Sequence, residues 1–490
     1  MDLLDFLLED NEEEEAAVAA VQVAVQAAMA NTVWMAEVMR SSEHVASTKK
    51  NTNWRLLPRK KKTKWRHSEA LQCIKRDYFG CDSIPDSPLF RKADFVMMFR
   101  VSKTRVELMM RAFMEAQIPF YNRKKDCFGN DVPSLEARIL LPLKTLAYGV
   151  PPYAFSDYFQ MSKTMARKCC VEFDSALMKV YEAEYLRLPT TEDIKSITSL
   201  HKAKHGVDGM FGSIDCMHTR WKNCPKGWAG QYSGKEGVPT IVLEAIADHH
   251  LWFWHASYGY AGTLNDLNVL NLSPFLDALV SGKFAEVETG AVPYKIGKES
   301  FDKLFVLADG IYPEYCRFVK AQKEPITDQE KLMTLWQESK RKDIERAFGV
   351  LQGKFQWIAR PIHLMKLADI SKRVGTCLIL HNMTVSDRIM GEVGLRYRPS
   401  SAFVEAEEAI DYSQEALERQ QEGSNREGPT IGLSNMNSKA QQLILSKNAW
   451  TDLKDQQQHS RLHVAIRNYL YEQQQERRKK RKADGNNGVA

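Results

Sequence analysis

The chain has 490 residues, of which 44% are apolar, with ten Trp and seventeen Tyr, and its formal net charge is +6. This apolar content can fill sizeable cores, which excludes a chain that is disordered throughout, and the length suits two or three domains of about 150 residues each. No run of about 18 apolar residues is found, so we expect no membrane span. Nine cysteines without a CxxC pair favour reduced thiols in an intracellular protein.

Charge is distributed unevenly near the N-terminus. Residues 1–39 contain nine acids and no Lys or Arg, whereas residues 55–66 contain seven basic residues and no acid. We expect residues 1–53 to form a disordered acidic tail and linker, which either is simply solvated or offers a short helix to a partner. The basic run at 59–67 is typical of phosphate contact or a nuclear localisation signal, with a solvated patch as the alternative.

Residues 54–190 have a helical pattern and are predicted to form a DNA-binding region. Ser102 is placed to cap one of these helices. Three further segments are expected at 135–148, 152–159 and 162–181, and Gly149 ends the first of them. Only a short break separates the second segment from the third, and this arrangement is typical of a helix-turn-helix over about 135–181. Its last helix carries cations on its first turns, namely Lys163, Arg167 and Lys168. An ordinary helical bundle with surface cations is the alternative.

Beyond residue 210 the pattern changes to strands. Runs of β-branched and aromatic residues predict four strands, at 211–217, 239–248, 251–258 and 304–308. A helical stretch at 267–280, divided at Pro274 with Ser273 as a cap, comes before the fourth strand, and a long helix is predicted over 327–355. This order of elements is compatible with a ribonuclease-H-like fold.

Four acidic residues stand at the ends or starts of these elements. They are Asp215 in FGSIDCMHTR, Asp266 in GTLNDLNVL, Asp309 in LFVLADGIYP and Glu345 in KRKDIERAFGVLQ, with 50, 42 and 35 residues between successive acids. Mg²⁺ prefers hard oxygen ligands held on a rigid backbone, so such acids indicate a metal site. Each acid alone also has a structural interpretation, and for Asp266 that interpretation is a helix N-cap.

Cations surround the glutamate on the long helix. They are Lys340, Arg341, Lys342 and Arg346. Glu345 lies about 100° around the helix from Ile344, which belongs to the buried stripe, so the carboxylate borders that stripe and can face a cleft. We predict that the four cations contact DNA phosphates. Salt bridges to Glu338 and Glu345 on a solvated face are the alternative.

The sequence segments around the acids resemble those of the transposases of the PIF/Harbinger superfamily, especially the plant-type branch. IDCMH matches the segment that carries the first aspartate of a DDE triad, ADGIYP the second and RKDIERAFGVLQ the glutamate, while WKNCPKGWAGQYSGKEG and ILHNM fit the same pattern. The resemblance covers roughly residues 70–390, with an insertion-like stretch at 282–300. It implies an α/β fold, in which a ribonuclease-H-like catalytic domain at 205–390, a mixed sheet with flanking helices, follows an all-α helix-turn-helix region.

The resemblance also implies the chemistry. Asp215, Asp309 and Glu345 are expected to be catalytic and to bind two divalent cations, Mg²⁺ or Mn²⁺, with Asp266 as a further ligand or an orienting group. The reaction would be metal-dependent cleavage of DNA strands followed by strand transfer, and the partner would be double-stranded DNA, both element ends and target. A domesticated nuclear DNA-binding or scaffold protein without nuclease activity is the alternative.

The resemblance further implies partners and a place in the cell. We expect a homodimer or larger assembly on DNA, a nuclear location, and a possible element-encoded partner with a Myb/SANT-like domain. Residues 398–439 are polar and are predicted to be a linker, and residues 440–490 a short helical segment, over about 450–471, with a basic tail. That tail contains six consecutive cations at 477–482, a second candidate for DNA contact or nuclear import.

Overall fold

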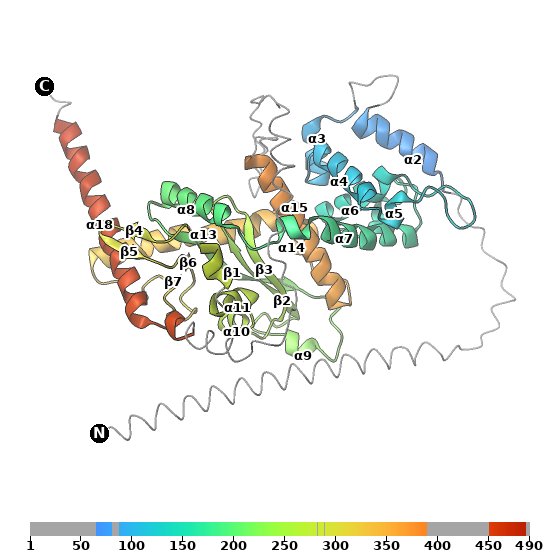
Figure 1. The fold of residues 1–490 in the computed structure, drawn as a ribbon. Helices are drawn as coiled ribbons and strands as arrows, with labels where there is room; N and C mark the ends of the chain where they lie inside the picture. Colours follow the sequence, from blue (N-terminus) through green and yellow to red (C-terminus); the bar gives the residue numbers. More distant parts are fainter. Residues whose placement is uncertain (1–64, 81–87, 282, 289, 390–449, 487–490) are drawn as a thin grey trace. The chain divides into compact units, whose positions relative to one another are not determined.

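The computed structural model describes residues 65–80, 88–281, 283–288, 290–389 and 450–486 (Figure 1). The predicted acidic tail at 1–53, most of the basic run at 59–67 and the linker at 398–439 lie outside the described residues. By contacts the chain divides into residues 1–64 and a second unit from Trp65 to Ala490, to which all described residues belong. Among the described helices, none is both long enough and apolar enough to cross a bilayer.

A five-stranded mixed sheet stands where the sequence predicts the catalytic domain. Its strands, in the order β3-β2-β1-β6-β7, are Phe253–Ala261, Thr240–Ala247, Met210–Arg220, Phe305–Leu307 and Phe318–Val319. β1 pairs antiparallel with β2, and β2 with β3, whereas β1 pairs parallel with β6, and β6 with β7. The sheet with its flanking helices is compatible with a ribonuclease-H-like domain preceded by helices, which confirms the predicted fold class.

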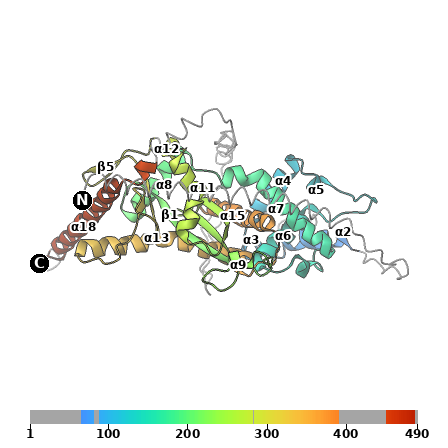
Figure 2. The same ribbon diagram turned by 90° about the horizontal axis from the view of Figure 1, so that it is seen from below.

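Helices cover both faces of this sheet (Figure 2). On one face α13 (Asp328–Lys354) and α15 (Leu367–Ile389) share a core with Ala245 of β2. On the other face lie α10 (Asp266–Asn271), α11 (Pro274–Val280) and α12 (Lys283–Glu288). Helix α11 shares a core with Ile214 of β1. Since successive strand residues point to opposite faces, Asp215, which pairs with Ala245, lies on the α13 face.

The helical region precedes the sheet. Its elements are α2 (His67–Ile74), η2 (Lys75–Phe79), α3 (Lys92–Phe99), α4 (Lys103–Glu115), α5 (Pro119–Asn122), α6 (Leu135–Tyr148), η3 (Pro152–Phe155) and α7 (Lys163–Tyr185). As predicted, the Ser102 side chain caps α4 by accepting the Arg105 N–H, and Gly149 ends α6 in the left-handed conformation with φ 62°. The middle segment of the predicted helix-turn-helix is a 3₁₀ turn followed by a non-helical stretch.

Two buried ion pairs join the helical region to α15. Arg373 Nε lies 2.8 Å from Asp174 Oδ2 on α7, and Arg105 on α4 pairs with Asp387. All four side chains are at most 9% exposed. Removing one partner of such a pair leaves an uncompensated buried charge, which costs about 3–5 kcal/mol. These pairs therefore fix α4 and α7 against α15 beside the sheet.

Several elements are additional to those predicted. They are α8 (Thr191–His205), α9 (Ala229–Tyr232), α12, the hairpin β4 (Tyr294–Ile296) and β5 (Glu299–Phe301), β7, α14 (Gln356–Ala359) and the long helix α15. The C-terminal helix α18, Gln456–Asn486, runs well past the predicted end at 471 and contains the basic run. Leu462 and Ile466 of α18 are buried in the core that contains α11 and β6, so this helix is part of the folded unit.

Candidate active site

Strand β1 places Asp215 on the sheet face that α13 covers. The side chain is 20% exposed. Its Oδ1 accepts the N–H of Cys216 at 2.8 Å, and its Oδ2 accepts a hydrogen bond from Arg341 Nη1 at 3.0 Å. The residue opposite it on β2 is Ala245. One carboxylate oxygen is thus held by backbone and the other only by a guanidinium group.

Helix α13 brings Glu345 to the same guanidinium. Arg341 and Glu345 are one helical turn apart, and Arg341 Nη2 lies 2.9 Å from Glu345 Oε1. The Glu345 side chain is 46% exposed, whereas that of Arg341 is 19% exposed. A single cation therefore bridges two of the three predicted catalytic carboxylates, from elements far apart in the sequence.

Asp309 follows β6, the parallel neighbour of β1. The register pairs Ser213 with Leu307, so two further residues along each chain lead to Asp215, which lies within β1, and to Asp309, which lies just beyond the end of β6. Asp309 is exposed, and its Oδ1 accepts the N–H of Gly310 at 2.7 Å. The parallel pairing thus brings Asp309 level with Asp215 along the neighbouring strand.

Asp266 is the first residue of α10, and the residue that caps this helix is its neighbour Asn265. The Asn265 side chain accepts the N–H of Asn268 at 2.8 Å. The N-cap interpretation of Asp266 is therefore wrong, because the preceding residue already fills that role. The negative charge of Asp266 acts on both Asp215 and Cys216, whose pKa values it raises.

The electrostatics of Asp215 favour a bound cation. Burial is the main cause that raises the pKa of Asp215, and the charges of Asp266 and Glu345 add to it, while the Cys216 N–H and Arg341 oppose it. Hard carboxylate oxygens that repel one another, with a guanidinium between two of them, are a donor set that suits Mg²⁺ or Mn²⁺. In this structure the positive charge that faces Asp215 and Glu345 is the guanidinium of Arg341.

The cations predicted to contact DNA fall into two groups. On α7, Lys163, Arg167 and Lys168 are all exposed on the first two turns. On α13, Lys342 is exposed and Lys340 half-buried, whereas two cations are engaged in ion pairs: Arg341 as above, and Arg346, whose Nη1 lies 2.6 Å from Asp343 Oδ1. The salt-bridge alternative to DNA contact thus describes Arg341, which pairs with Glu345, whereas the partner of Arg346 is Asp343, which was not predicted.

A second cluster on α13 was not predicted from the sequence. Among the described residues, His201, His205 and Asp343 are the one group of three or more His, Cys, Asp or Glu side chains whose ligand atoms all lie within 4.8 Å of one another. The predicted triad does not meet this limit. The i,i+4 spacing of His201 and His205 was the only sequence signal for the cluster, and it is weak because the partners lie elsewhere in the chain.

Hydrogen bonds already occupy this histidine cluster. Asp343 Oδ2 accepts from His205 Nε2 at 2.9 Å and from His249 Nδ1 at 3.0 Å. His201 donates from Nδ1 to the Met210 carbonyl at 2.8 Å, and its Nε2 accepts the backbone N–H of His249 at 3.1 Å. The cluster therefore braces α8, the β2–β3 turn and α13 against one another, and it offers a metal fewer unoccupied ligand atoms than its composition suggests.

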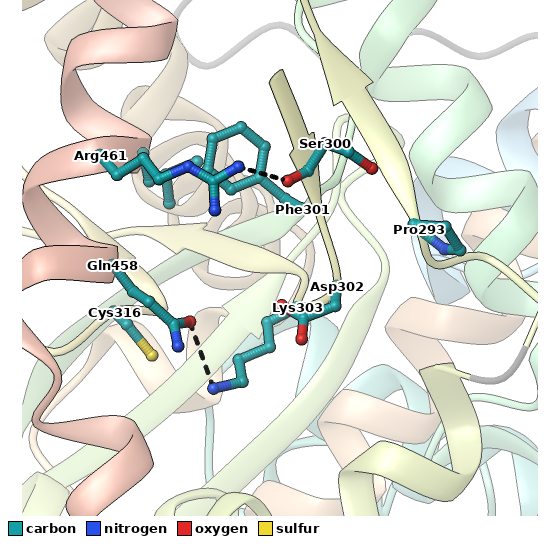
Figure 3. Close-up of a pocket in the computed structure, with 9 residues that line it drawn as sticks. Pro293, Ser300, Phe301, Asp302, Lys303, Cys316, Gln458 and Arg461 are labelled. Atoms are coloured by element: carbon teal, nitrogen blue, oxygen red, sulfur yellow. Dashed lines mark hydrogen bonds between the residues drawn. The ribbon is translucent and has the colours of Figure 1, made fainter.

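A cavity of about 270 Å³ lies away from the acids, between the β4–β5 hairpin and α18 (Figure 3). Arg461 of α18 donates to the Ser300 carbonyl at 2.9 Å across it, and Lys303 Nζ lies 3.4 Å from Gln458 Oε1. None of the four predicted acids lines this cavity. It is therefore separate from the candidate active site.

Residues 183–391 match the family model described as plant transposon protein. This region is similar to plant transposon proteins. The matched span contains all four acids, the whole sheet and the helix that carries Arg341 and Glu345, and it supports a transposase-related family. Comparison with curated proteins and with solved structures gave no match.

Proposed function

We propose that this protein is a DDE transposase of the PIF/Harbinger type, which cleaves DNA strands in a metal-dependent reaction and transfers them. The observation that carries the proposal is the meeting of Asp215 and Glu345 at one guanidinium, inside the region that matches plant transposon proteins. Asp309, which follows the parallel strand β6 that pairs with β1, completes the predicted triad. The motif resemblance around these three acids supplies the finer assignment.

The three carboxylates would divide the metal ligation among them. Asp215 on β1, Asp309 after β6 and Glu345 on α13 would together hold the two ions. The two divalent cations would supply the positive charge that stabilises the attacking and leaving oxygens of a phosphodiester. Asp266 would lie further out, where its charge strengthens the negative field around Asp215.

The reaction would proceed in two balanced steps. In the first, water attacks phosphorus at the element end, the bond from phosphorus to the 3′ oxygen breaks, and the strand leaves with a free 3′-hydroxyl. In the second, that hydroxyl attacks a target phosphodiester, which joins element to target and releases a target 3′-hydroxyl. The residues of this chain would orient the scissile phosphate, with Lys340 and Lys342 of α13, close to Glu345 in the sequence, as candidate phosphate contacts.

DNA recognition would come from the helical region. The exposed cations at the start of α7 fit a helix that enters the major groove. A homodimer would pair two DNA ends, the basic run in α18 would serve nuclear import or DNA contact, and a Myb/SANT-like protein would be an additional partner.

The experiment is Mg²⁺- or Mn²⁺-dependent cleavage of DNA that carries the flanking repeats of the gene's own locus. Wild type is compared with Asp309→Ala and Glu345→Ala, each checked for an unchanged melting temperature. We expect cleavage by the wild type alone. Tight DNA binding without cleavage, with and without a Myb-like partner, would instead support the domesticated DNA-binding or scaffold protein.

A further inference from the structure

A short turn in the helical region, residues 123–131 between α5 and α6, has a surface that the proposed catalytic site does not use (Figure 1). We name it the basic turn. Arg123, Lys124 and Lys125 are consecutive and exposed, and none of the three forms an ion pair within the described part of the chain. At its tip Phe128 is 84% exposed.

The basic turn is held in one shape by its own hydrogen bonds. Asp126 Oδ1 accepts the N–H groups of Phe128 and Asn130, both at 2.8 Å, and the Asp126 N–H donates to the Asn130 carbonyl at 2.8 Å. Gly129, with φ +80°, supplies the left-handed residue that the turn needs. An aromatic ring is thus presented to solvent on a braced turn, where it packs against nothing in the described core.

The base of the basic turn is anchored next to α7. The buried side chain of Arg138 donates to the carbonyls of Phe120 and Arg123, the latter at 3.1 Å. Lys168, one of the exposed cations of α7, lies with its Nζ 5.6 Å from the centre of the Phe120 ring. Lys168 of the candidate recognition helix therefore lies near Phe120, three residues before the first cation of the basic turn, Arg123.

We propose that the basic turn is a second DNA-contact surface, in which three cations bind phosphates and Phe128 is inserted as a wedge between base steps. A single exposed apolar side chain needs no explanation by itself. Here it stands beside three cations whose charge is complementary to the phosphate backbone, and proteins that insert apolar wedges kink the duplex by about 20–90°. The proposal rests on the DNA binding in the proposed function and adds a binding mode to it.

The test measures binding and bending of an end-labelled duplex of about 30 base pairs from the locus repeats, without metal, by anisotropy and by energy transfer between the two ends. Phe128→Ala should weaken binding by about tenfold and abolish the bend, and Phe128→Trp should retain both. Replacing Arg123, Lys124 and Lys125 with Gln should lower the slope of log affinity against log salt by about 0.9 for each phosphate lost.

The control is Ile326→Ala, which removes a side chain that is 82% exposed and lies outside the helical region. It should bind and bend DNA as the wild type does. Wild-type bending and an unchanged salt slope in the Phe128 and triple variants, with unchanged melting temperatures, would overturn the proposal. The two proposals fail separately: DNA bound and bent but never cleaved contradicts the transposase, whereas cleavage with unaltered binding in the turn variants contradicts only the wedge.

Discussion

Helix α13 carries two acidic residues, two positions apart, that lie in opposite surroundings. Asp343 is 4% exposed, and its carboxylate accepts hydrogen bonds from His205, His249 and Arg346. Glu345 is 46% exposed and is paired with Arg341, which it shares with Asp215. Hydrogen-bond donors surround the Asp343 carboxylate, whereas the Glu345 carboxylate is paired through Oε1 and is partly open to solvent.

The pKa shifts of the two clusters differ in the same way. Burial alone would raise the pKa of Asp343, but hydrogen bonds from His205 and His249 lower it below its usual value. The pKa of Asp215 is raised, by burial and by its acidic neighbours. A closed cluster of this kind stabilises a fold, and an open cluster with unbalanced negative charge is suited to gain a cation.

The largest effect is expected in the open cluster. Glu345→Gln should lower the rate of DNA cleavage at least about a thousandfold, because loss of a metal ligand removes stabilisation of the transition state. Its stability should change little, since the side chain is half exposed. Single-turnover cleavage and urea unfolding of the same preparation check both parts, and a variant that cleaves at the wild-type rate would remove Glu345 from the triad.

The closed cluster should respond in the opposite way. Asp343→Asn should lower the free energy of unfolding by about 2–4 kcal/mol, because a buried charge that three donors surround is lost. Cleavage per folded molecule should stay within a few fold of wild type. Urea unfolding supplies the first quantity and a cleavage assay well below the unfolding midpoint the second; unchanged stability with lost cleavage would show that Asp343 belongs to the chemistry.

His201 should make the closed cluster sensitive to acid. Burial lowers its pKa from 6.5 to about 4, so the unfolded chain binds a proton that the folded chain does not, and stability falls as pH drops from about 7 toward 4. Asp248 acts in the opposite sense, because its pKa is raised to about 6 by burial, so its contribution is lost as pH rises through that value. The contribution of His201 to the free energy of unfolding is therefore measured as the difference between wild type and His201→Gln. This difference should fall by about 2 kcal/mol between pH 7 and pH 5.

A smaller effect, on the affinity for Mn²⁺, should show that Arg341 competes with a metal ion for Asp215 and Glu345. Without DNA, Arg341→Met should bind Mn²⁺ about two- to fivefold more tightly than wild type, because the cation that competes for Asp215 and Glu345 is gone and partly exposed ion pairs contribute about 0.2–1 kcal/mol each. Titration calorimetry measures this, with Lys342→Ala as a control that removes a neighbouring charge. Weaker Mn²⁺ binding in Arg341→Met would mean that the guanidinium organises the site instead.

The sequence predicted those parts of the molecule that local signals encode. Ser102 and Ser273 cap helices as predicted, Thr327 caps the long helix whose start was predicted there, and each of the four predicted strand segments overlaps a strand. The meeting of Asp215 with Glu345 could be expected from the family resemblance, but their bridging by Arg341 depends on the packing of α13 against β1. The histidine cluster could not be foreseen, because His201, His249 and Asp343 come from three elements whose contact is set by tertiary structure.

The sequence patterns also failed to predict several short elements. β7 and the β4–β5 hairpin have two or three residues per strand, too few for an alternating pattern to stand out. The end of α18 was placed too early because its last turns are polar and cationic, without the apolar period that marks a buried helix.

The most direct test asks which of the two clusters on α13 binds the metal. Fe²⁺ is exchanged into the full-length protein, ascorbate and peroxide generate hydroxyl radicals at the bound ion, and mass spectrometry maps the backbone cuts. The account predicts cuts next to Asp215, Asp309 and Glu345 that excess Mg²⁺ suppresses. Cuts confined to the histidines of α8 and the β2–β3 turn, with none at Asp215 or Asp309, would contradict it.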